Sequence, residues 1–419
     1  MAAPQWQSCA LRMKRPNNSM LEDHLVNPAG LFAQHTPLRI DSGCKLPAGT
    51  IEAAAVLAQS AISCDPNVPT VRLPIRLEAG FFSTIHGVVG DALGAGATVN
   101  LVYPALSVWR SYGNDQCTHL DCYFEGYPRA CGEHPAVLPA ARRAMLVYTS
   151  QARSIAEGGS FARFAMAAAL MARLTVPSPR MRTTLDAAKA AIGWERARRP
   201  IIGLHVRDGD SCGAFEQQRT ARTCGGLAEA LPTIRALARA YGARTIFLAT
   251  DGQHVVNATR RETDFEWLML GDTVRFISPP AAPAPPPPLH TRVSTPLATR
   301  GAAHGARGAR RSDRALEGSE AETEAEGMSL RIEARLARRA VHHVDGSVLA
   351  QQSLVDAMLL ADADILVGKF TSNLFRAAVE LKAGRLGALP PFVSLDAAWC
   401  FLYKGSVVRG KHAGKTFGC

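Results

Sequence analysis

The sequence predicts an α/β protein whose parallel sheet is built from strands that alternate with helices along the chain. Two short apolar runs, at 201–206 and 245–249, lie on either side of a helical pattern at 226–241. The same alternation returns around a third apolar run at 365–367. Strands connected through helices are joined by right-handed crossovers, and these make neighbouring strands parallel.

Each of these elements follows from a local pattern. Apolar residues recur at three- and four-residue spacing over 226–241, which is typical of an amphipathic helix. Gly242 is well placed to end this helix, because glycine readily adopts the left-handed conformation found there. The apolar run 274–277 predicts a further strand, and helices at 351–360 and 372–381 flank the last one.

The N-terminal half shows a second strand–helix–strand pattern. After Arg72 the chain predicts a strand, followed by a turn at 78–80 and a helix that runs through Ile85 and Val89. A short apolar strand is expected at 101–103. This half therefore predicts a small α/β unit of its own.

Length and composition indicate a globular chain of several parts. The 419 residues are 47% apolar and 20% charged, which excludes a fully disordered or collagen-like protein. We predict a poorly ordered N-terminal extension at 1–66, an α/β and helical domain at 67–198 and a second domain at 199–419. Seven of the ten residues at 279–288 are proline and charge-segregated sequence follows, so 279–327 predicts a disordered insertion.

The net charge of +11 is concentrated in the stretch 141–200, which holds eleven basic residues against three acids. This stretch belongs to a mostly helical region, 139–194, which Pro177 and Pro179 divide into two pieces. Its arginines follow a helical pattern with few aromatic residues between them for stacking on bases. The pattern favours a solvated helical face over a nucleic-acid surface, so no nucleic-acid partner is expected.

Residues that can carry chemistry lie where the predicted strands end. The strand 201–206 runs into Arg207 and an acidic turn with Asp208 and Asp210. A guanidinium at the carboxyl edge of a parallel sheet lies where ligands of such folds bind, and its planar fork matches phosphate oxygens. The alternative is a surface arginine that pairs with Asp208 or Asp210.

Two further strand ends carry polar residues. Asp251 follows the strand 245–249 and could bind a sugar hydroxyl or orient an arginine, or it could simply cap the next helix. Thr371 and Ser372 follow the strand 365–367 at the start of a helix. Hydroxyls and backbone N–H groups at a helix N-terminus form an anion site, although these residues could equally serve as ordinary capping residues.

Taken in order, the three strand ends resemble a known group. They read HVRDGD at 205–210, FLATDG at 247–252 and VGKFTSN at 367–373, while GFFSTIH at 80–86 and CYF at 122–124 precede them. This order is similar to that of the GDP-fucose-dependent fucosyltransferase superfamily, closest to its α-1,6-fucosyltransferase branch. The resemblance covers roughly 70–400 without the insertion.

The resemblance implies a GT-B-like fold, with two facing α/β domains and a Rossmann-like C-terminal domain that binds the nucleotide sugar. It implies transfer of fucose from GDP-fucose to a glycan or glycoprotein acceptor, with inversion and without a metal or other cofactor. A protein O-fucosyltransferase-like enzyme is the alternative within the same chemistry. A non-catalytic nucleotide-sugar- or glycan-binding protein is the alternative outside it.

The resemblance also implies roles for single residues. Arg207 would bind the β-phosphate of GDP and stabilise the charge that develops as the nucleotide leaves, while Ser372 and Thr371 line the phosphates. Asp356 would read guanine, unless it is only a polar helix position. His205 and Gly80 would lie beside the donor, and Asp251 would support the donor pocket. Asp210 and Glu216 would act in catalysis, with Glu216 as the base for the acceptor hydroxyl.

The sequence departs from the family at several motif positions. Asp208 stands where the family has a second arginine, and Gly252 stands where it has a second aspartate. Phe82 replaces a glycine of the N-terminal turn, and Glu216 is shifted by one residue from the expected base. Donor binding is expected to survive these changes, whereas the acceptor and the rate are left open.

The cysteine content bears on the compartment. Ten cysteines are many for a cytosolic chain, so disulfides in an oxidising lumen are weighed against reduced, buried thiols. Proximity in sequence favours the pairs Cys212–Cys224 and Cys400–Cys419. Together with the resemblance this predicts a Golgi or other secretory-pathway lumen, and cytoplasm otherwise. We expect no membrane-spanning helix and see no signal peptide.

Overall fold

A computed structural model of the chain describes ten parts of it, and all of them belong to one compact unit. The described residues are 45–62, 70–72, 80–95, 100–102, 117, 120–126, 159–208, 225–271, 346–396 and 399. The predicted insertion 279–327, the predicted strand 274–277 and both predicted cysteine pairs lie outside these parts.

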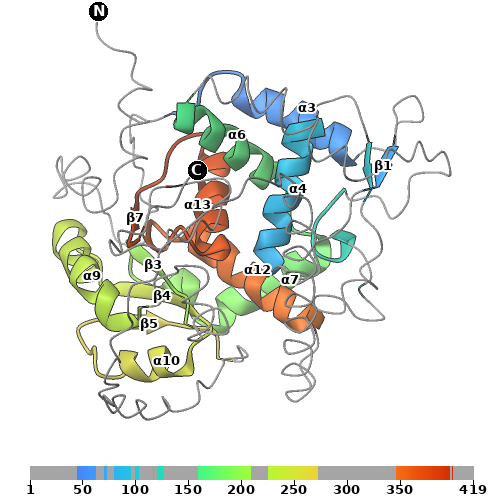
Figure 1. The fold of residues 1–419 in the computed structure, drawn as a ribbon. Helices are drawn as coiled ribbons and strands as arrows, with labels where there is room; N and C mark the ends of the chain where they lie inside the picture. The colour runs from blue at the N-terminus through green and yellow to red at the C-terminus, as the bar shows by residue number, and fades with distance from the viewer. Residues whose placement is uncertain are drawn as a thin grey trace, which may run out of the picture. The chain divides into compact units, whose positions relative to one another are not determined.

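A five-stranded parallel sheet organises the C-terminal half (Figure 1). Its strands are β3 (Ile201–Val206), β4 (Thr245–Thr250), β5 (Glu266–Leu268), β6 (Ile365–Gly368) and β7 (Phe392–Ser394), in the order β5-β4-β3-β6-β7. The predicted α/β class and the strands β3, β4 and β6 are confirmed. β4 and β5 follow β3 on one side of the sheet, whereas β6 and β7 lie on its other side. The strand order therefore reverses between β3 and β6, which makes this position a topological switch point. Open α/β sheets bind ligands at the carboxyl edge of such a point.

Both faces of this sheet are buried. Alternate residues of β3 point to opposite sides, so Ile202 and Leu204 pack with the helices α9 (Leu227–Tyr241) and α10 (Gln253–Thr259). The other face, with Ile201, is covered by the helices α12 (Gly346–Asp362) and α13 (Asn373–Leu386). Gly242 ends α9 with a φ of 68°, as the sequence predicted.

Among the described residues, the N-terminal half contributes a smaller sheet and four more helices. Strands β1 (Thr70–Arg72) and β2 (Asn100–Val102) pair in parallel. β1 ends at Arg72, where the sequence predicted a strand to begin, and residues 73–79 lie outside the described parts. The helices are α3 (Thr50–Ile62), α4 (Phe81–Ala95), α6 (Gly159–Leu174) and α7 (Pro179–Ala191), with 3₁₀ turns at Leu120–Cys122 and Trp194–Arg196. Helix α3 lies within the stretch 1–66 that we predicted to be poorly ordered, and its buried side packs on the core.

The predicted division of the helical region at Pro177 and Pro179 is confirmed. Ser178 caps α7, and its hydroxyl oxygen accepts a hydrogen bond from the backbone N–H of Met181 at 3.3 Å. Pro179 occupies the first helical position, where the missing N–H costs nothing. The Ser178 hydroxyl also donates to the carbonyl of Cys122 at 2.8 Å, which ties the start of α7 to an earlier segment.

One hydrophobic core crosses the domain boundary that we predicted after residue 198. Helix α6 packs closely on α13, because a Cβ at Gly384 would lie 2.2 Å from the carbonyl oxygen of Ala168. Only glycine permits such an approach of two helix backbones. Residues before and after position 198 therefore contribute to one hydrophobic cluster in the described parts of the chain.

Two findings concern the compartment that we predicted. Cys117 and Cys122 form a disulfide, with their Cα atoms 5.7 Å apart. Of the helices in the described ranges, none is long and apolar enough to cross a membrane.

Lys382 on α13 forms a buried contact at the amino edge of the sheet. Its Nζ donates hydrogen bonds to the carbonyl oxygens of Ala361 at 3.1 Å and Ala363 at 2.6 Å, at the end of α12. Burial lowers the pKa of Lys382 to about 8, against a partial opposing effect of Asp364 and Asp362.

The lowered pKa predicts a pH dependence of stability. Between about pH 8 and pH 10.5 the unfolded lysine keeps its proton while the folded one releases it, so the free energy of unfolding rises with pH. We expect Lys382→Met to lose this rise in urea denaturation at the two ends of that range. Lys189→Met, at a lysine with 22% side-chain exposure on α7, is the control that should retain it. An unchanged pH dependence in Lys382→Met would contradict the assignment.

Candidate functional site

Charged side chains follow four of the five strands at the carboxyl edge of the sheet. Arg207 and Asp208 follow β3, Asp251 follows β4, Lys369 follows β6 and Asp396 follows β7. Because the strands are parallel, these residues share one edge, and the switch point between β3 and β6 lies among them. This edge is the candidate site.

Arg207 and Asp251 form the first pair of the site. The guanidinium NH1 lies 2.5 Å from Asp251 Oδ2, and the other carboxylate oxygen accepts the backbone N–H of Asp208 at 2.8 Å. The side chain of Arg207 is 37% exposed, so a ligand can still reach it. Arg207 thus pairs with Asp251, which follows the neighbouring strand β4, and not with Asp208 as in the alternative. Helix α10 is capped by Gly252, so Asp251 orients the arginine instead of capping the helix.

His205 lies just before Arg207 and is buried. Its ring stacks on Phe375 of α13, with centroids 6.4 Å apart. Burial, and then the nearby charge of Arg207, lower the pKa of His205 to about 3, so the imidazole is neutral at physiological pH. Its Nδ1 has no hydrogen-bond partner among the described residues. A buried polar atom without a partner is costly, and a bound ligand is one source of that partner.

The turn between β6 and α13 is held by Asp396. Its carboxylate accepts the backbone N–H groups of Phe370 at 2.9 Å and Thr371 at 3.4 Å, and also the hydroxyls of Thr371 and Ser394. The Thr371 hydroxyl that we predicted to line a phosphate is therefore directed at Asp396. Asp396 acts instead as the residue that shapes the turn.

Ser372 begins α13 without a side-chain capping hydrogen bond. The first backbone hydrogen bond of the helix runs from Arg376 N–H to the Ser372 carbonyl, so the N–H groups of the preceding first turn point out of the helix end. Gly368 brings this turn close to the sheet, because a Cβ there would lie 2.4 Å from the ring of Phe375. Helix dipole and N–H groups together favour an anion at this position.

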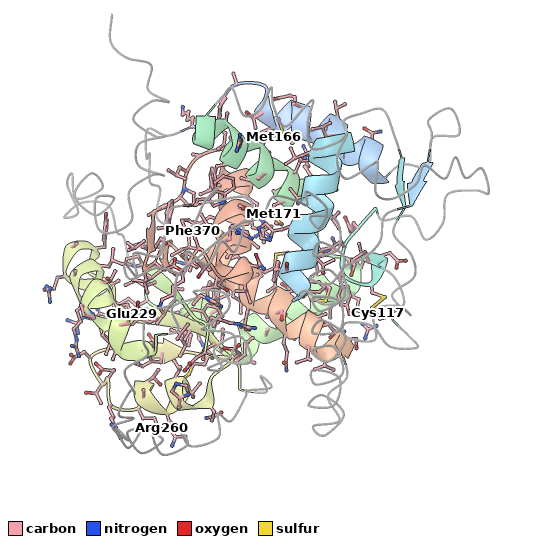
Figure 2. All side chains as sticks on the ribbon, in the orientation of Figure 1. Cys117, Met166, Met171, Glu229, Arg260 and Phe370 are labelled. Carbon is pink, nitrogen blue, oxygen red and sulfur yellow. A yellow bond between two sulfur atoms is a disulfide. The ribbon has the colours of Figure 1, made fainter. Side chains whose placement is uncertain are left out.

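Two acid–base pairs flank the switch point. Lys369 Nζ lies 2.7 Å from Oε2 of Glu229, a residue in the first turn of α9 that is labelled in Figure 2. Asp208 pairs with His254 Nε2 from the first turn of α10. Burial raises the pKa of Asp208, which His254 opposes and the nearby Asp251 reinforces. The carboxyl edge of the sheet thus carries acidic side chains that each pair with a basic one.

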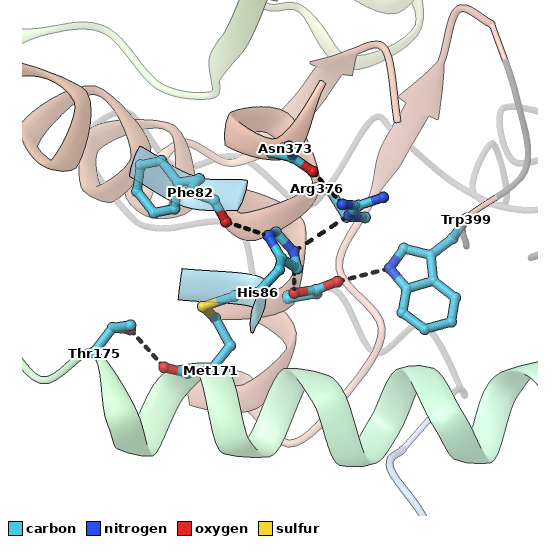
Figure 3. A network of polar contacts seen from close by, with 8 residues as sticks. Phe82, His86, Met171, Thr175, Asn373, Arg376 and Trp399 are labelled. Atoms are coloured by element: carbon cyan, nitrogen blue, oxygen red, sulfur yellow. Dashed lines mark hydrogen bonds and ion pairs between the residues drawn. The ribbon is translucent and has the colours of Figure 1, made fainter. Parts of the chain in front are cut away.

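A buried polar network fixes α13 against α4 (Figure 3). His86 Nδ1 lies 2.7 Å from the Phe82 carbonyl, and its Nε2 lies 3.3 Å from Arg376 Nε and 3.0 Å from Glu380 Oε2. Arg376 also donates to Asn373 in the first turn of α13, and Trp399 Nε1 donates to Glu380 at 2.8 Å. Apart from the partly buried Asn373, these residues lie inside the core, so the position of the α13 N-terminus depends on them.

The other predicted site residues fall outside this cluster. Asp356 is buried in α12, on the helix that covers the same sheet face as His205. Gly80 is exposed, and its carbonyl accepts the N–H of Thr84 at the start of α4. Asp210 and Glu216 lie outside the described residues.

Four residues of the site were missed by sequence reasoning. His254, Glu229, Lys369 and Asp396 come from two helix starts and two strand ends. Lys369 lies within a motif that we had singled out, and Asp396 follows a three-residue strand, β7, that we did not predict. A charged residue one or two positions after a strand, as at four of the five strand ends of the sheet, is the signal that would have found these two.

Comparison with known proteins gives a distant likeness. No protein-family model matches the chain, and no curated protein matches it. Solved structures that are similar include POFUT1 in its apo form, at 11% identity and a TM-score of 0.38. POFUT1 in complex with GDP has 10% identity and a TM-score of 0.40, and in complex with GDP-fucose 11% and 0.39. Each match covers 80% of this chain and 99% of the other. At this level of likeness the function has to be inferred from this chain's own residues.

Proposed function

We propose that this protein transfers fucose from GDP-fucose to a glycan or protein acceptor, with the donor diphosphate bound at the switch point between β3 and β6. The observation that carries the proposal is the arrangement at that point. The guanidinium of Arg207, held by Asp251, follows β3, and β3 itself carries a neutral His205 whose Nδ1 has no hydrogen-bond partner among the described residues. The N-terminus of α13 follows β6, the neighbouring strand. The motifs that resemble the fucosyltransferase superfamily supply all three parts.

The chemistry of the parts fits a nucleoside diphosphate. Arg207 is positioned by Asp251, and a guanidinium can form bidentate hydrogen bonds with phosphate oxygens. The N-terminus of α13 offers a second place for an anion, and Ser372 lies there as its N-cap residue. A hydroxyl or phosphate oxygen of the donor would provide the missing partner for His205 Nδ1.

The proposed reaction proceeds with inversion and without a metal. As the bond between fucose C1 and the phosphate oxygen breaks, negative charge grows on GDP, and a fixed arginine stabilises this charge without needing to reorganise. Asp251 keeps the guanidinium in place while the charge develops. Asp356 is proposed to read guanine, because it is a buried carboxylate on the sheet face that His205 also occupies.

The disulfide between Cys117 and Cys122 supports a place in the secretory-pathway lumen, as disulfides persist in oxidising compartments. We therefore propose that the acceptor is a glycan or glycoprotein of that compartment. The residues Asp208 and Gly252, which depart from the superfamily motifs, bear on the rate and not on donor binding.

Titration calorimetry and a turnover assay test the proposal. We expect GDP to bind and UDP to bind far more weakly, because only guanine offers the contacts proposed for Asp356. GDP-fucose should then release GDP in the presence of EDTA, with fucose appearing on a member of a glycan and glycoprotein panel. GDP binding without any turnover would favour the non-catalytic alternative, and no GDP binding would exclude both.

A further inference from the structure

The pair Asp208–His254 lies beside the proposed donor site and has no part in the function described so far. Asp208 directly follows Arg207, and its carboxylate contacts His254 Nε2. His254 has a side chain that is 55% exposed, whereas that of Asp208 is 16% exposed. A half-exposed imidazole backed by a largely buried carboxylate thus lies next to Arg207 in the fold.

Asp208 and Gly252 lie next to each other in the fold. A Cβ placed on Gly252 would lie 3.1 Å from Asp208 Cβ and 3.4 Å from its Oδ2. A side chain at 252 would therefore crowd the carboxylate at 208, and a second acid there would also repel it. The two departures from the superfamily motifs thus form one coupled change, which makes room for a carboxylate that holds His254.

Resting on the proposed function, we propose that His254, oriented by Asp208, is the general base that removes the proton from the acceptor hydroxyl. Contact with the carboxylate places the proton of the neutral imidazole on Nε2 and leaves the Nδ1 lone pair open. A carboxylate that fixes the tautomer and orientation of a histidine in this way is a recurring arrangement in catalytic sites.

The step balances with the groups at hand. The acceptor hydroxyl proton moves to His254 Nδ1, and the acceptor oxygen forms a bond to fucose C1. The bond from C1 to the β-phosphate oxygen breaks, and its electron pair leaves with GDP beside Arg207. The imidazolium, stabilised by Asp208, then returns its proton to solvent.

A continuous chain of contacts links this base to the donor. Asp251 binds Arg207 through one oxygen and the Asp208 backbone N–H through the other, while the Asp208 side chain binds His254. The base and the leaving-group arginine are thereby held in one rigid arrangement. A surface ion pair of ordinary kind would contribute little to stability and nothing to turnover.

The charges around the dyad bear on its pH dependence. Asp208, Asp251, Arg207 and Lys369 are the charged groups that face it from β3, β4 and β6. His254 opposes the rise in the pKa of Asp208, so replacing it by glutamine also acts on Asp208. Loss of the acidic limb of the rate profile in that variant would therefore report the dyad of Asp208 and His254.

The test measures GDP release from GDP-fucose by wild type, His254→Gln, His254→Ala and Glu216→Gln. We expect His254→Gln to lower turnover by about 10² or more, the range of general base catalysis, with GDP affinity nearly unchanged. The acidic limb of its pH profile should disappear, and added imidazole should restore part of the activity of His254→Ala. Arg235→Gln removes another ion pair, Arg235–Glu262, and is the matched control that should turn over as wild type does.

The outcomes separate the two proposals. Wild-type turnover together with full activity in His254→Gln, or loss only in Glu216→Gln, would overturn the base assignment and leave the fucosyltransferase intact. A loss without imidazole rescue and with an unchanged pH profile would show a structural role and also overturn it. A wild-type protein that binds GDP but never releases it from GDP-fucose would overturn both.

Discussion

Arg207→Ala is expected to lower kcat for GDP-fucose turnover by about 10²–10³ while the protein remains folded. The arginine contacts the diphosphate in the bound donor and contacts it more strongly as charge develops on the leaving GDP. An interaction that strengthens in the transition state affects kcat beyond any loss of binding. Thermal unfolding should change little, because the side chain is 37% exposed and its partner Asp251 keeps a hydrogen bond from Asp208.

Arg207→Lys separates charge from geometry. Lysine retains the positive charge but lacks the planar fork that binds two oxygens at once, so it should restore little of the lost kcat. Steady-state kinetics of the two variants, with GDP affinity measured alongside, check this. Retention of more than about a tenth of wild-type turnover by Arg207→Ala would reduce the arginine to an ion-pair partner of Asp251.

Glu380→Gln should have the largest effect on stability. Glu380 is completely buried, and it lies in the network that contains Arg376 and His86. Removing the carboxylate takes away the buried negative charge beside His86 and leaves the positive charge of Arg376 in the core. Removing one member of a buried set of charges costs about 3–5 kcal/mol. We expect this loss in the free energy of unfolding, measured by urea denaturation.

The double variant Arg376→Met/Glu380→Leu provides the control. Replacing both charges by apolar groups of similar volume removes the uncompensated ion, so the double variant should be more stable than Glu380→Gln. Even so, it should bind GDP more weakly, because Arg376 also holds Asn373 at the start of α13. A loss below about 1 kcal/mol in Glu380→Gln, the size typical of an exposed pair, would contradict the assignment.

His86 joins the other members of this buried network. A single Nε2 atom lies between Arg376 and Glu380, and it can accept from the first or, when protonated, donate to the second, but not both at once. The sequence places His86 only in a helix after a glycine turn. Nothing in its local pattern indicates that its partners lie some 290 residues away.

Strands with strong local patterns could be predicted from the sequence. β3, β4 and β6 are runs of buried apolar residues, and a parallel strand buried on both faces produces such a run by itself. β5 and β7 have only three residues each, and their strand state depends on pairing with β4 and β6. Such short edges carry too little sequence signal to be recognised without the sheet.

The candidate site divides in the same way. Arg207, Asp251 and Ser372 each follow a predicted strand, so parallel strands alone require them to share one edge of the sheet. Their local sequence therefore determined that a polar edge would form. Which residues pair there, Arg207 with Asp251 and Asp208 with His254, depended on strand order and helix placement. Such pairings join segments far apart in the chain, and only the tertiary structure, through packing and register, decides which side chains come within hydrogen-bond distance.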